Sequence, residues 1–280
     1  MTPRIAAGPR RAAVVGHPIS HSLSPLLHTT AYRALGLTDW AYEAHDVRPG
    51  ELSTFLAGCG DEWVGLSVTM PHKVDAALLA AARAPSVERT GVANTLLRSP
   101  RGWQAHNTDI EGIVGSLRGV ARVAPTTVTV LGTGATARSA CAAAVDLRSA
   151  VLTVVGRNPA AGAQCLSVIT GTGVSGHLVD LGDAQGCARA LTANVVIATV
   201  PPGAADSIID RVPAVGAGML LDVAYRPWPT PLASAWQQAG GQVVAGVDML
   251  VHQACAQILL MTGRPVAVDS LLGVARGAAH

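Results

Sequence analysis

Short apolar runs alternate with helical stretches through the first part of the chain. AAVVG at 12–16, WAYEAHDV at 40–47 and GLSVT at 65–69 have the length and composition of strands. Between the first two, Ser24-Pro25 is typical of a helix start and Gly36 of a helix end. This alternation of strand and helix predicts a parallel or mixed sheet covered by helices.

A glycine-rich turn opens the second part of the pattern. TTVTVLGTGATARSA at 126–140 predicts a strand, the turn Gly132-x-Gly134-x-x-Ala137 and an alanine-rich helix. Three more buried strands are predicted, at 150–157, 195–200 and 219–225. Together these elements predict a Rossmann-type unit of roughly 120 residues.

Two helix starts flank this unit. Thr108-x-x-Glu111 has the form of a capping box at the start of a helix near residue 109. Asp248 is predicted to cap a later helix that stops near Gly263, with another short helix after it. The whole chain is therefore predicted to be an α/β protein.

Composition narrows the class of protein. The chain has 280 residues, of which 49% are hydrophobic and 14% charged, as expected for a compact globular protein of one large or two medium domains. The formal net charge of +2 is too small to imply a nucleic-acid or membrane partner. The sequence has no run of 18 apolar residues, and its basic N-terminus lacks a clean signal-peptide pattern, so we expect a short tail before a strand.

Cysteine and histidine positions argue against a metal site. The five cysteines are an odd number without CxxC spacing, which predicts reduced thiols in a cytoplasmic protein. His17, His21 and His28 are close in sequence, but no carboxylate or cysteine completes a ligand set. We therefore predict no metal.

Lys73 is an unusual residue for its position. Pro71 is predicted to open a helix, which places Lys73 in the first turn, facing the positive end of the helix dipole. A residue that breaks a local rule without local gain points toward function, although a solvated lysine is the plain alternative. Asp109 begins another predicted helix, where an acid is favourable for its own sake.

The glycine turn predicts a dinucleotide site. Its glycines let the backbone approach a pyrophosphate, whose charge the helix N-terminus then holds. A tight turn without a nucleotide is the alternative. About twenty residues on, Gly156-Arg157-Asn158 stands where an NAD site usually has an acid, and an arginine there suits the 2′-phosphate of NADP.

Three further features suggest a ligand. Ser22 and Ser24 stand at a helix N-terminus and could bind one carboxylate or phosphate, although Ser24 alone is explained by helix capping. Tyr225 follows a buried strand, where ligands bind in open α/β sheets. Gln253 lies within the last strong helix, where a surface position is the default expectation.

These motifs together resemble the shikimate dehydrogenase family over nearly the whole chain. The matching runs, in family order, are GHPISHSLSP, SVTMPHK, GVANT, NTDIEG, LGTGATA, DVAYRPWPTPL and GVDMLVHQA. The resemblance implies a discontinuous substrate-binding domain, residues 1–108 with 248–280, and an NADP-binding Rossmann domain at 109–247, with the active site in the cleft between them. It also implies reversible reduction of 3-dehydroshikimate to shikimate by NADPH.

The resemblance assigns roles to individual residues. Lys73 and Asp109 are implied to be the catalytic pair, and Ser22 and Ser24 to hold the substrate carboxylate. The residues implied to surround the substrate hydroxyls are Thr69, Lys73, Asn94, Asp109 and Gln253, with Tyr225 near substrate and nicotinamide. The implied cofactor-binding residues are Gly132, Thr133, Gly134, Ala135, Thr136, Ala137, Arg157, Thr199, Val200, Val223 and Gly246.

The chain departs from the family at several positions. Ser67 replaces a usual asparagine, the loop reads GTGATA instead of a double-glycine form, and Ala161 replaces a second basic residue beyond Arg157. These departures predict a moderate preference for NADP over NAD.

The chemistry is consistent with these roles. Hydride arriving at a ketone places negative charge on oxygen, which a nearby ammonium stabilises and can protonate. Asp109 can orient Lys73. The alternatives are a quinate or shikimate dehydrogenase that accepts NAD, an enzyme acting on an amino analogue, and a catalytically silent nucleotide sensor; paired serines argue against methylenetetrahydrofolate dehydrogenase. A monomer and a homodimer both remain open.

Overall fold

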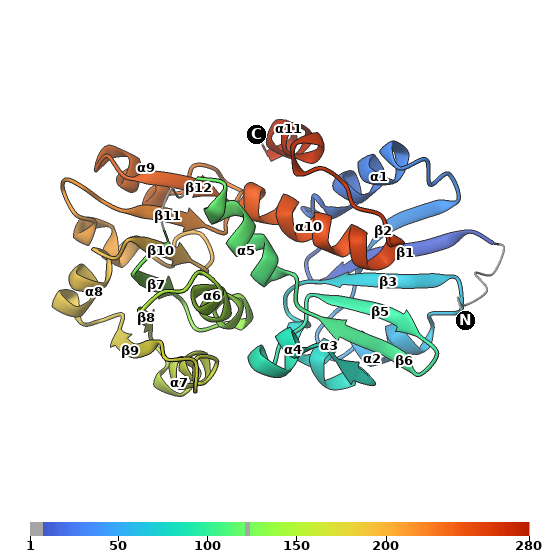
Figure 1. The fold of residues 1–280 in the computed structure, drawn as a ribbon, viewed down its shortest axis with the longest axis horizontal. Coiled ribbons are helices and arrows are strands. Elements are labelled where there is room, and N and C mark those ends of the chain that lie inside the picture. Colours follow the sequence, from blue (N-terminus) through green and yellow to red (C-terminus); the bar gives the residue numbers. More distant parts are fainter. Residues whose placement is uncertain (1–7, 121–123, 280) are drawn as a thin grey trace. The chain divides into compact units, whose positions relative to one another are not determined.

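The computed structural model describes residues 8–120 and 124–279, so the predicted tail at 1–7 lies outside the described residues. The chain divides into two compact units, each built from separate segments (Figure 1). The first unit comprises Met1–Val87, Val92–Thr108 and Ala254–Leu271, and the second comprises Glu88–Gly91, Asp109–Gln253 and Leu272–His280. Across the described residues, no helix is long and apolar enough to cross a membrane.

The first unit is organised around a mixed six-stranded sheet in the order β2-β1-β3-β5-β6-β4. Its strands are β1 (Arg10–Gly16), β2 (Trp40–Asp46), β3 (Trp63–Val68), β4 (Ala82–Arg83), β5 (Thr95–Ser99) and β6 (Gly102–His106). Strands β2, β1 and β3 are parallel to one another, and β5 is antiparallel to both β3 and β6. The helices are α1 (Ser24–Ala34), α2 (Leu52–Ala57), α3 (Lys73–Leu79) and the start of α4 (Pro85–Thr90).

Apolar side chains cover both faces of this sheet. On one face Leu66 and Val68 of β3 pack with residues of α2 and α3, such as Leu52 and Ala76. On the other face β1 and β2 pack against Tyr32 of α1 and Met261, which belongs to the last turns of α10 (Gly246–Thr262). Both faces are closed, as expected for a sheet that contains parallel strands.

The second unit contains a six-stranded, all-parallel sheet in the order β12-β11-β10-β7-β8-β9. The strands are β7 (Thr127–Leu131), β8 (Val151–Gly156), β9 (Ser175–Asp180), β10 (Val195–Ala198), β11 (Met219–Asp222) and β12 (Gln242–Ala245). The chain runs outward from β7 to β9 and then restarts at β10 on the other side. The order therefore reverses between β7 and β10, as a Rossmann fold requires, which confirms the prediction.

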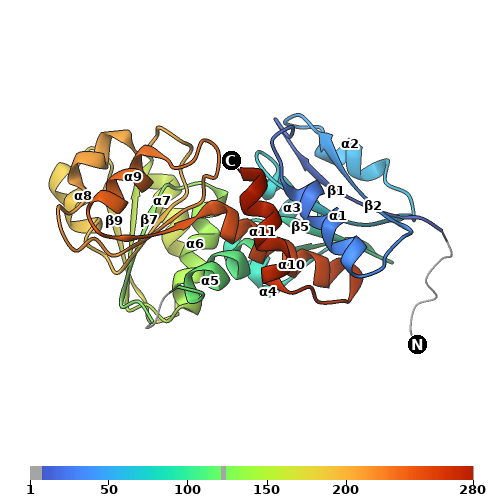
Figure 2. The ribbon, with the colours of Figure 1, turned by 90° about the horizontal axis from the view of Figure 1, so that it is seen from above.

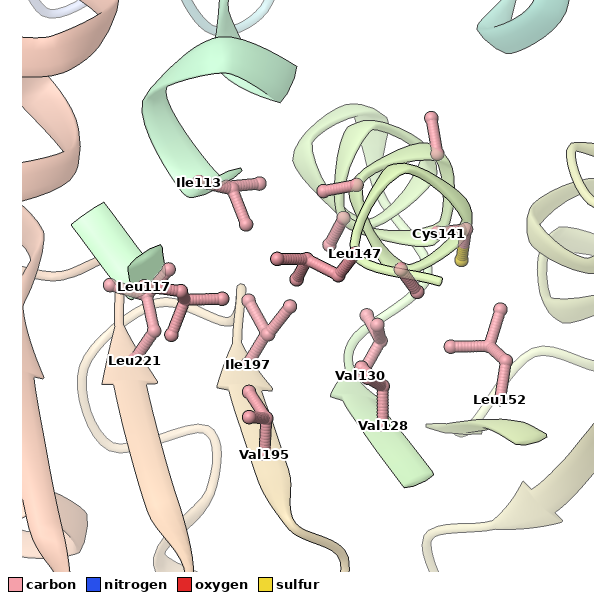
Figure 3. Close-up of a cluster of buried hydrophobic side chains, with 14 of the residues drawn as sticks. Ile113, Leu117, Val128, Val130, Cys141, Leu147, Leu152, Val195, Ile197 and Leu221 are labelled. Carbon is pink, nitrogen blue, oxygen red and sulfur yellow. The ribbon is translucent and has the colours of Figure 1, made fainter. Parts of the chain in front are cut away.

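Helices cover both faces of the parallel sheet (Figures 1 and 2). On one face lie α5 (Asp109–Arg118), α6 (Ala135–Asp146) and α7 (Pro159–Ser167), and on the other α8 (Ala184–Ala190), the 3₁₀ helix η1 (Asp206–Arg211) and α9 (Pro231–Gln238). Figure 3 shows Ile113 and Leu117 of α5 and Leu147, just after α6, directed toward the strand residues Ile197 and Val130. The chain ends in α11 (Val268–Ala279).

Several predicted helix starts were wrong by one to three residues. α1 begins at Ser24, so the N-cap position belongs to Leu23, and the Ser22 hydroxyl accepts a hydrogen bond of 3.3 Å from the Ser24 N–H. Ser24 is therefore a helix residue and not the cap. At the other end Gly36 adopts φ +68° and stops the helix, as predicted.

Pro71 and Asp248 were also misplaced. The His72 N–H donates to the Thr69 carbonyl at 2.9 Å, so Pro71 lies inside a turn and α3 begins only at Lys73. α10 begins at Gly246, which places Asp248 in its first turn, paired with Arg276 of α11 at 2.9 Å. α11 has 12 residues and is longer than predicted.

Candidate functional site

The glycine turn after β7 depends on a close approach between two strand ends. Gly132 has φ +112°, and a Cβ at this position would lie 2.6 Å from the Thr199 Oγ1. The Thr199 hydroxyl in turn donates to the Leu131 carbonyl at 2.8 Å, which ties the end of β10 to the end of β7. Only glycine fits this position, because both the backbone angle and the available space exclude a side chain.

Gly134 has a different role in the same turn. It takes the N-cap position of α6 with φ −82°, and a Cβ there would meet no atom of the described residues within 4 Å. The protein's own packing therefore leaves room at this position, as the approach of a pyrophosphate to the helix N-terminus requires. Ala135 and Thr136 form the first turn of α6, and Ala137 is fully buried in the core beneath it.

A pocket of about 180 Å³ lies beside this turn, at the carboxyl ends of β7 and β8. Four of the predicted cofactor residues line it, namely Gly132, Thr133, Arg157 and Val200. Among the described residues that line the pocket, none is acidic. Asn158 caps α7 by accepting a hydrogen bond of 3.1 Å from the Ala161 N–H. A cation beside a helix start, without a carboxylate, suits a phosphate group.

The loop after β11 is tied down at both ends. The buried Asp222 carboxylate accepts hydrogen bonds from the Thr230 hydroxyl at 2.5 Å and from the Ala224 N–H at 3.1 Å. Burial raises the pKa of Asp222. Tyr225 lies within this loop at the carboxyl end of the strand, as predicted, and burial raises its pKa, so its hydroxyl stays protonated at neutral pH.

Val223 and Gly246 lie together in the second unit. Gly246 follows β12, and a side chain there would collide with the Val223 backbone carbonyl. The predicted cofactor residues therefore occupy the carboxyl ends of five strands of the parallel sheet and the first turn of α6. This is the edge at which open α/β sheets bind ligands.

In the first unit, the predicted substrate residues lie at one edge of the mixed sheet. Ser22 and Ser24 follow β1, while Thr69 and Lys73 follow β3, which is parallel to β1. Asn94 immediately precedes β5, whose antiparallel pairing sets Thr95 opposite Ser67 near the end of β3. The sheet topology therefore brings together five polar residues that are spread over more than seventy positions of the sequence.

Lys73 occupies the first position of α3 and is half-buried. Its backbone carbonyl accepts a hydrogen bond of 2.8 Å from the Ala93 N–H, one residue before Asn94. The predicted position in the first helical turn is therefore confirmed. The neighbouring Thr69 N–H donates to the Val15 carbonyl at 3.0 Å, which fixes the turn between β3 and α3 against β1.

Asn94 is 1% exposed, and its amide orientation is fixed. The Asn94 Oδ1 accepts hydrogen bonds from the Thr108 N–H at 2.7 Å and from the Thr95 hydroxyl at 2.9 Å. The Asn94 Nδ2 donates to the Thr108 Oγ1 at 3.0 Å. Since the oxygen accepts the backbone N–H, the orientation of the amide is set, with the nitrogen as its donor.

Asp109 and Gln253 belong to the second unit and are both buried, at 3% and 8% exposure. Asp109 is the first residue of α5. The default expectation of a surface position for Gln253 was wrong: a Cβ on Gly112 of α5 would lie 2.9 Å from the Gln253 Cβ, so α10 packs tightly on α5 there. Gln253 is therefore a buried polar residue, and such a residue indicates a function more strongly than the exposed glutamine that we expected.

The histidines have separate partners. His17 hydrogen bonds to the Asp46 carboxylate at 2.9 Å, whereas His28 is fully buried and stacks on Tyr42 at 3.9 Å between ring centroids. Within the described part of the chain, no three potential metal ligands lie together. The five cysteines are all free thiols.

Sequence reasoning missed three polar residues behind the substrate edge, Tyr42, Thr95 and Gln257, and interpreted Thr108 only as a helix cap. Gln257 carried a detectable signal, because it is a second glutamine about one helical turn after Gln253 and so lies on the same face of the helix. Ser67, recognised only as a departure from the family, joins the same group by accepting a 2.6 Å hydrogen bond from Tyr42.

Comparisons with known proteins agree with this geometry. The model of the shikimate dehydrogenase substrate binding domain matches residues 14–96. The crystal structure of Mycobacterium tuberculosis shikimate dehydrogenase is 42% identical, covers 96% of this chain and 100% of its own, and superposes with a TM-score of 0.88. A curated relative from Synechocystis sp., shikimate dehydrogenase (NADP(+)), is 31% identical over 278 residues, with 95% of each chain covered. The Thermus thermophilus shikimate 5-dehydrogenase in complex with NADP(H) and shikimate is 27% identical, covers 96% of this chain and 99% of its own, and has a TM-score of 0.82.

Proposed function

This chain belongs to the shikimate dehydrogenase family, and from that premise we propose that it catalyses the reversible NADPH-dependent reduction of 3-dehydroshikimate to shikimate. The reaction is a step in aromatic amino-acid biosynthesis. The observation that carries the proposal is the clustering of Ser22, Ser24, Thr69, Lys73 and Asn94 at one edge of the first unit's sheet. These residues match the groups of this substrate. The serine hydroxyls suit its carboxylate, the Asn94 amide suits its hydroxyls, and Lys73 suits its carbonyl.

The domain assignment follows the function. Residues 1–108 and 248–280 form the substrate-binding domain, and residues 109–247 form the NADP-binding domain. The discontinuous first unit and the parallel sheet of the second support this division. The compact units divide within α10 at Ala254, a few residues after the assigned boundary. They also place Glu88–Gly91 and Leu272–His280 in the second unit, where the functional assignment differs from them.

Each substrate-site residue has a distinct task. Ser22 and Ser24 bind the carboxylate, and Thr69, Asn94 and Gln253 hydrogen bond to the ring hydroxyls. Lys73 stabilises negative charge that develops on the carbonyl oxygen and can supply its proton, while Asp109 orients Lys73 and accepts from a hydroxyl. Tyr225 is assigned a place near the substrate and the nicotinamide. Support comes from Asn94, Asp109 and Gln253 being buried polar residues, which are more informative about function than exposed ones.

The second unit fits NADP. When bound, this cofactor supplies the hydride that reduces the ketone. The space left by Gly132 and Gly134 and the N-terminus of α6 suit the pyrophosphate, and Arg157 beside a pocket without acidic lining among the described residues suits the 2′-phosphate. Arg157 thereby sets a moderate preference for NADP over NAD.

The enzyme acts on a small molecule in the cytoplasm, without nucleic acid or membrane as partner. Five free thiols and a net charge of only +2 support this placement.

A steady-state assay of the purified chain tests the proposal. Oxidation of shikimate is followed by formation of reduced nicotinamide, with NADP and NAD in parallel and with quinate as the competing substrate. We expect kcat/KM to be highest for the pair of shikimate and NADP. A folded protein that binds NADP but turns over neither shikimate nor quinate would be a silent sensor, and a preference for quinate with NAD would replace the proposed substrate and cofactor.

A further inference from the structure

A row of hydrogen-bonded polar side chains runs through the interior of the first unit. The Tyr42 hydroxyl donates to the Ser67 Oγ at 2.6 Å, and the Ser67 hydroxyl donates to the Gln257 Oε1 at 2.7 Å. The Gln257 Nε2 donates to the Thr95 Oγ1 at 2.9 Å, and the Thr95 hydroxyl donates to the Asn94 Oδ1 at 2.9 Å. These groups lie on β2, β3, α10 and the start of β5, in the layer between the sheet and α10.

Gln257 is the central member of this row. Its side chain is fully buried, and it joins two neighbouring strands, since it accepts from Ser67 of β3 and donates to Thr95 of β5. The Gln257 Nε2 also donates to the Asn94 backbone carbonyl at 3.1 Å, and the His28 ring lies 3.4 Å from its Oε1. An apolar residue would satisfy helix packing at this position, as Met261 does one turn later, so packing alone does not explain a glutamine.

The direction of the hydrogen bonds in the row sets the orientation of the Asn94 amide. Each hydroxyl accepts from one side and donates to the other, so the donors all point from Tyr42 toward Asn94. The row ends on the Asn94 oxygen, which therefore faces the interior. Reversing the Asn94 amide would set its NH₂ group against the Thr95 and Thr108 donors. The network thereby fixes the amide nitrogen as the group that Asn94 can offer to a substrate hydroxyl.

The other end of the row lies near the carboxylate side of the site. Burial raises the pKa of Tyr42, and hydrogen bonding to Ser67 and, more weakly, to Ser24 opposes this shift. Tyr42 also stacks on His28, one turn of α1 after Ser24. The row therefore spans the first unit from the α1 serine to the asparagine before β5.

We propose that Gln257, acting through Thr95, is a positioning residue that holds the Asn94 amide in the orientation that donates to the substrate hydroxyls. This inference rests on the proposed function, because it assigns Asn94 to substrate binding. Removal of this support leaves the Asn94 amide held by Thr108 alone, so its orientation is fixed less firmly and binding of shikimate weakens, while binding of NADP does not change.

An isosteric pair of variants tests this inference. Thr95→Val keeps the shape of the side chain and removes its hydroxyl, whereas Thr95→Ser keeps the hydroxyl. We expect Thr95→Val to raise the KM for shikimate about threefold to tenfold, the scale of one lost hydrogen bond, with the KM for NADP unchanged and Thr95→Ser within about twofold of wild type. Gln257→Met should reproduce the effect of Thr95→Val.

Thr129→Val is the matched control. Thr129 is a buried threonine of the second unit whose hydroxyl donates to the Ala190 carbonyl at 2.7 Å, so its loss carries the general cost of an unpaired buried group. An unchanged KM for shikimate in folded Thr95→Val, or an equal rise in the KM of both substrates, overturns the positioning role. Wild-type protein without activity on shikimate overturns the proposed function instead, so the two failures are distinguishable.

Discussion

In the second unit apolar side chains from helices cover both faces of the parallel sheet, whereas in the first unit a row of polar side chains lies between the sheet and the helices α1 and α10. In the proposed function, the second unit offers mainly backbone to NADP, through glycines at strand ends. The first unit offers side chains from several elements to shikimate. A backbone contact needs only a correct turn, while a side-chain amide needs hydrogen-bond partners behind it, which explains why the extended polar row lies in the first unit.

Removal of the two side chains proposed to be catalytic should give the largest effect. These variants test the chemical step separately from the binding of either substrate. We expect Lys73→Ala and Asp109→Asn each to lower kcat by roughly 10²–10⁴-fold, because each removes a positioned acid–base or electrostatic group. Stopped-flow single turnovers measure the chemical step, and a melting curve checks the fold. Folded Lys73→Ala with near-normal turnover would remove this residue from the mechanism.

Truncation of the two serines proposed to bind the substrate carboxylate should affect the binding of shikimate and not that of NADP. Ser22→Ala and Ser24→Ala should raise the KM for shikimate by about tenfold or more and lower kcat less, since a hydrogen bond to a remote carboxylate is equally strong in the ground and transition states. Because Ser24 does not cap α1, its loss should not carry the cost of a lost helix cap, and any fall in melting temperature reports its buried hydroxyl, which hydrogen bonds to Tyr42. A lower kcat at constant KM would contradict the assignment.

The sequence was most informative where structure is local. The turn around Gly132 and the strands beside it were predicted correctly, because strand, turn and helix follow one another within fifteen residues. Helix starts at Pro71 and Asp248 were misplaced, since a proline or an aspartate suits a preceding turn or a first helical turn as well as a cap. Strand β9 was missed because nearly all its residues are exposed, which leaves no apolar pattern.

The polar row of the first unit could not be predicted for a different reason. Ser67 and Gln257 are 190 positions apart, and only the fold brings α10 over β3 and β5. The hairpin of β5 and β6 was also missed, and without it Thr95 has no place in a sheet. Local propensity carries no information about such pairs.

Two alanine variants of the glycine turn sharpen the contrast within the second unit. Gly132→Ala should lower the free energy of unfolding by about 1–3 kcal/mol, because its φ of +112° and the nearby Thr199 hydroxyl both oppose a side chain. Gly134→Ala should change stability less than Gly132→Ala, since the N-cap preference for glycine and the lower unfolded-state entropy of alanine act in opposite directions, yet it should weaken NADP binding. Chemical denaturation and cofactor titration measure the two quantities. Equal destabilisation by both variants would mean that Gly132 and Gly134 do not have separate roles, one in the fold and one in cofactor binding.

The buried histidine beside the polar row should make the first unit sensitive to acid. Burial lowers the pKa of His28 from 6.5 to about 3, so the folded form stays neutral while the unfolded chain takes up a proton below about pH 6.5. The stabilisation is therefore complete above pH 6.5 and is lost as pH falls toward 3, with a slope of up to about 1.4 kcal/mol per pH unit.

His28→Phe keeps an aromatic ring against Tyr42 and removes the titrating group. The variant should lose this part of the pH slope in urea unfolding between pH 4 and pH 7, whatever its absolute stability. Tyr42→Phe, which removes only a hydroxyl, serves as the control and should keep the slope. Identical slopes for wild type and His28→Phe would show that protonation of this ring does not limit stability in acid.

Substitution of Arg157 should give the smallest effect. It tests whether the second unit uses a side chain to recognise the 2′-phosphate of NADP. It is exposed beside the pocket after β8, so salt screens its attraction to a 2′-phosphate. Arg157→Ala should raise the KM for NADP a few-fold, the usual scale for an exposed charge pair, and leave the KM for NAD almost unchanged. The difference should shrink as ionic strength rises. Arg189→Ala, at an exposed arginine outside this pocket, should alter neither KM. Equal effects of Arg157→Ala on both cofactors would mean that the second unit selects its nucleotide through backbone and pocket shape alone.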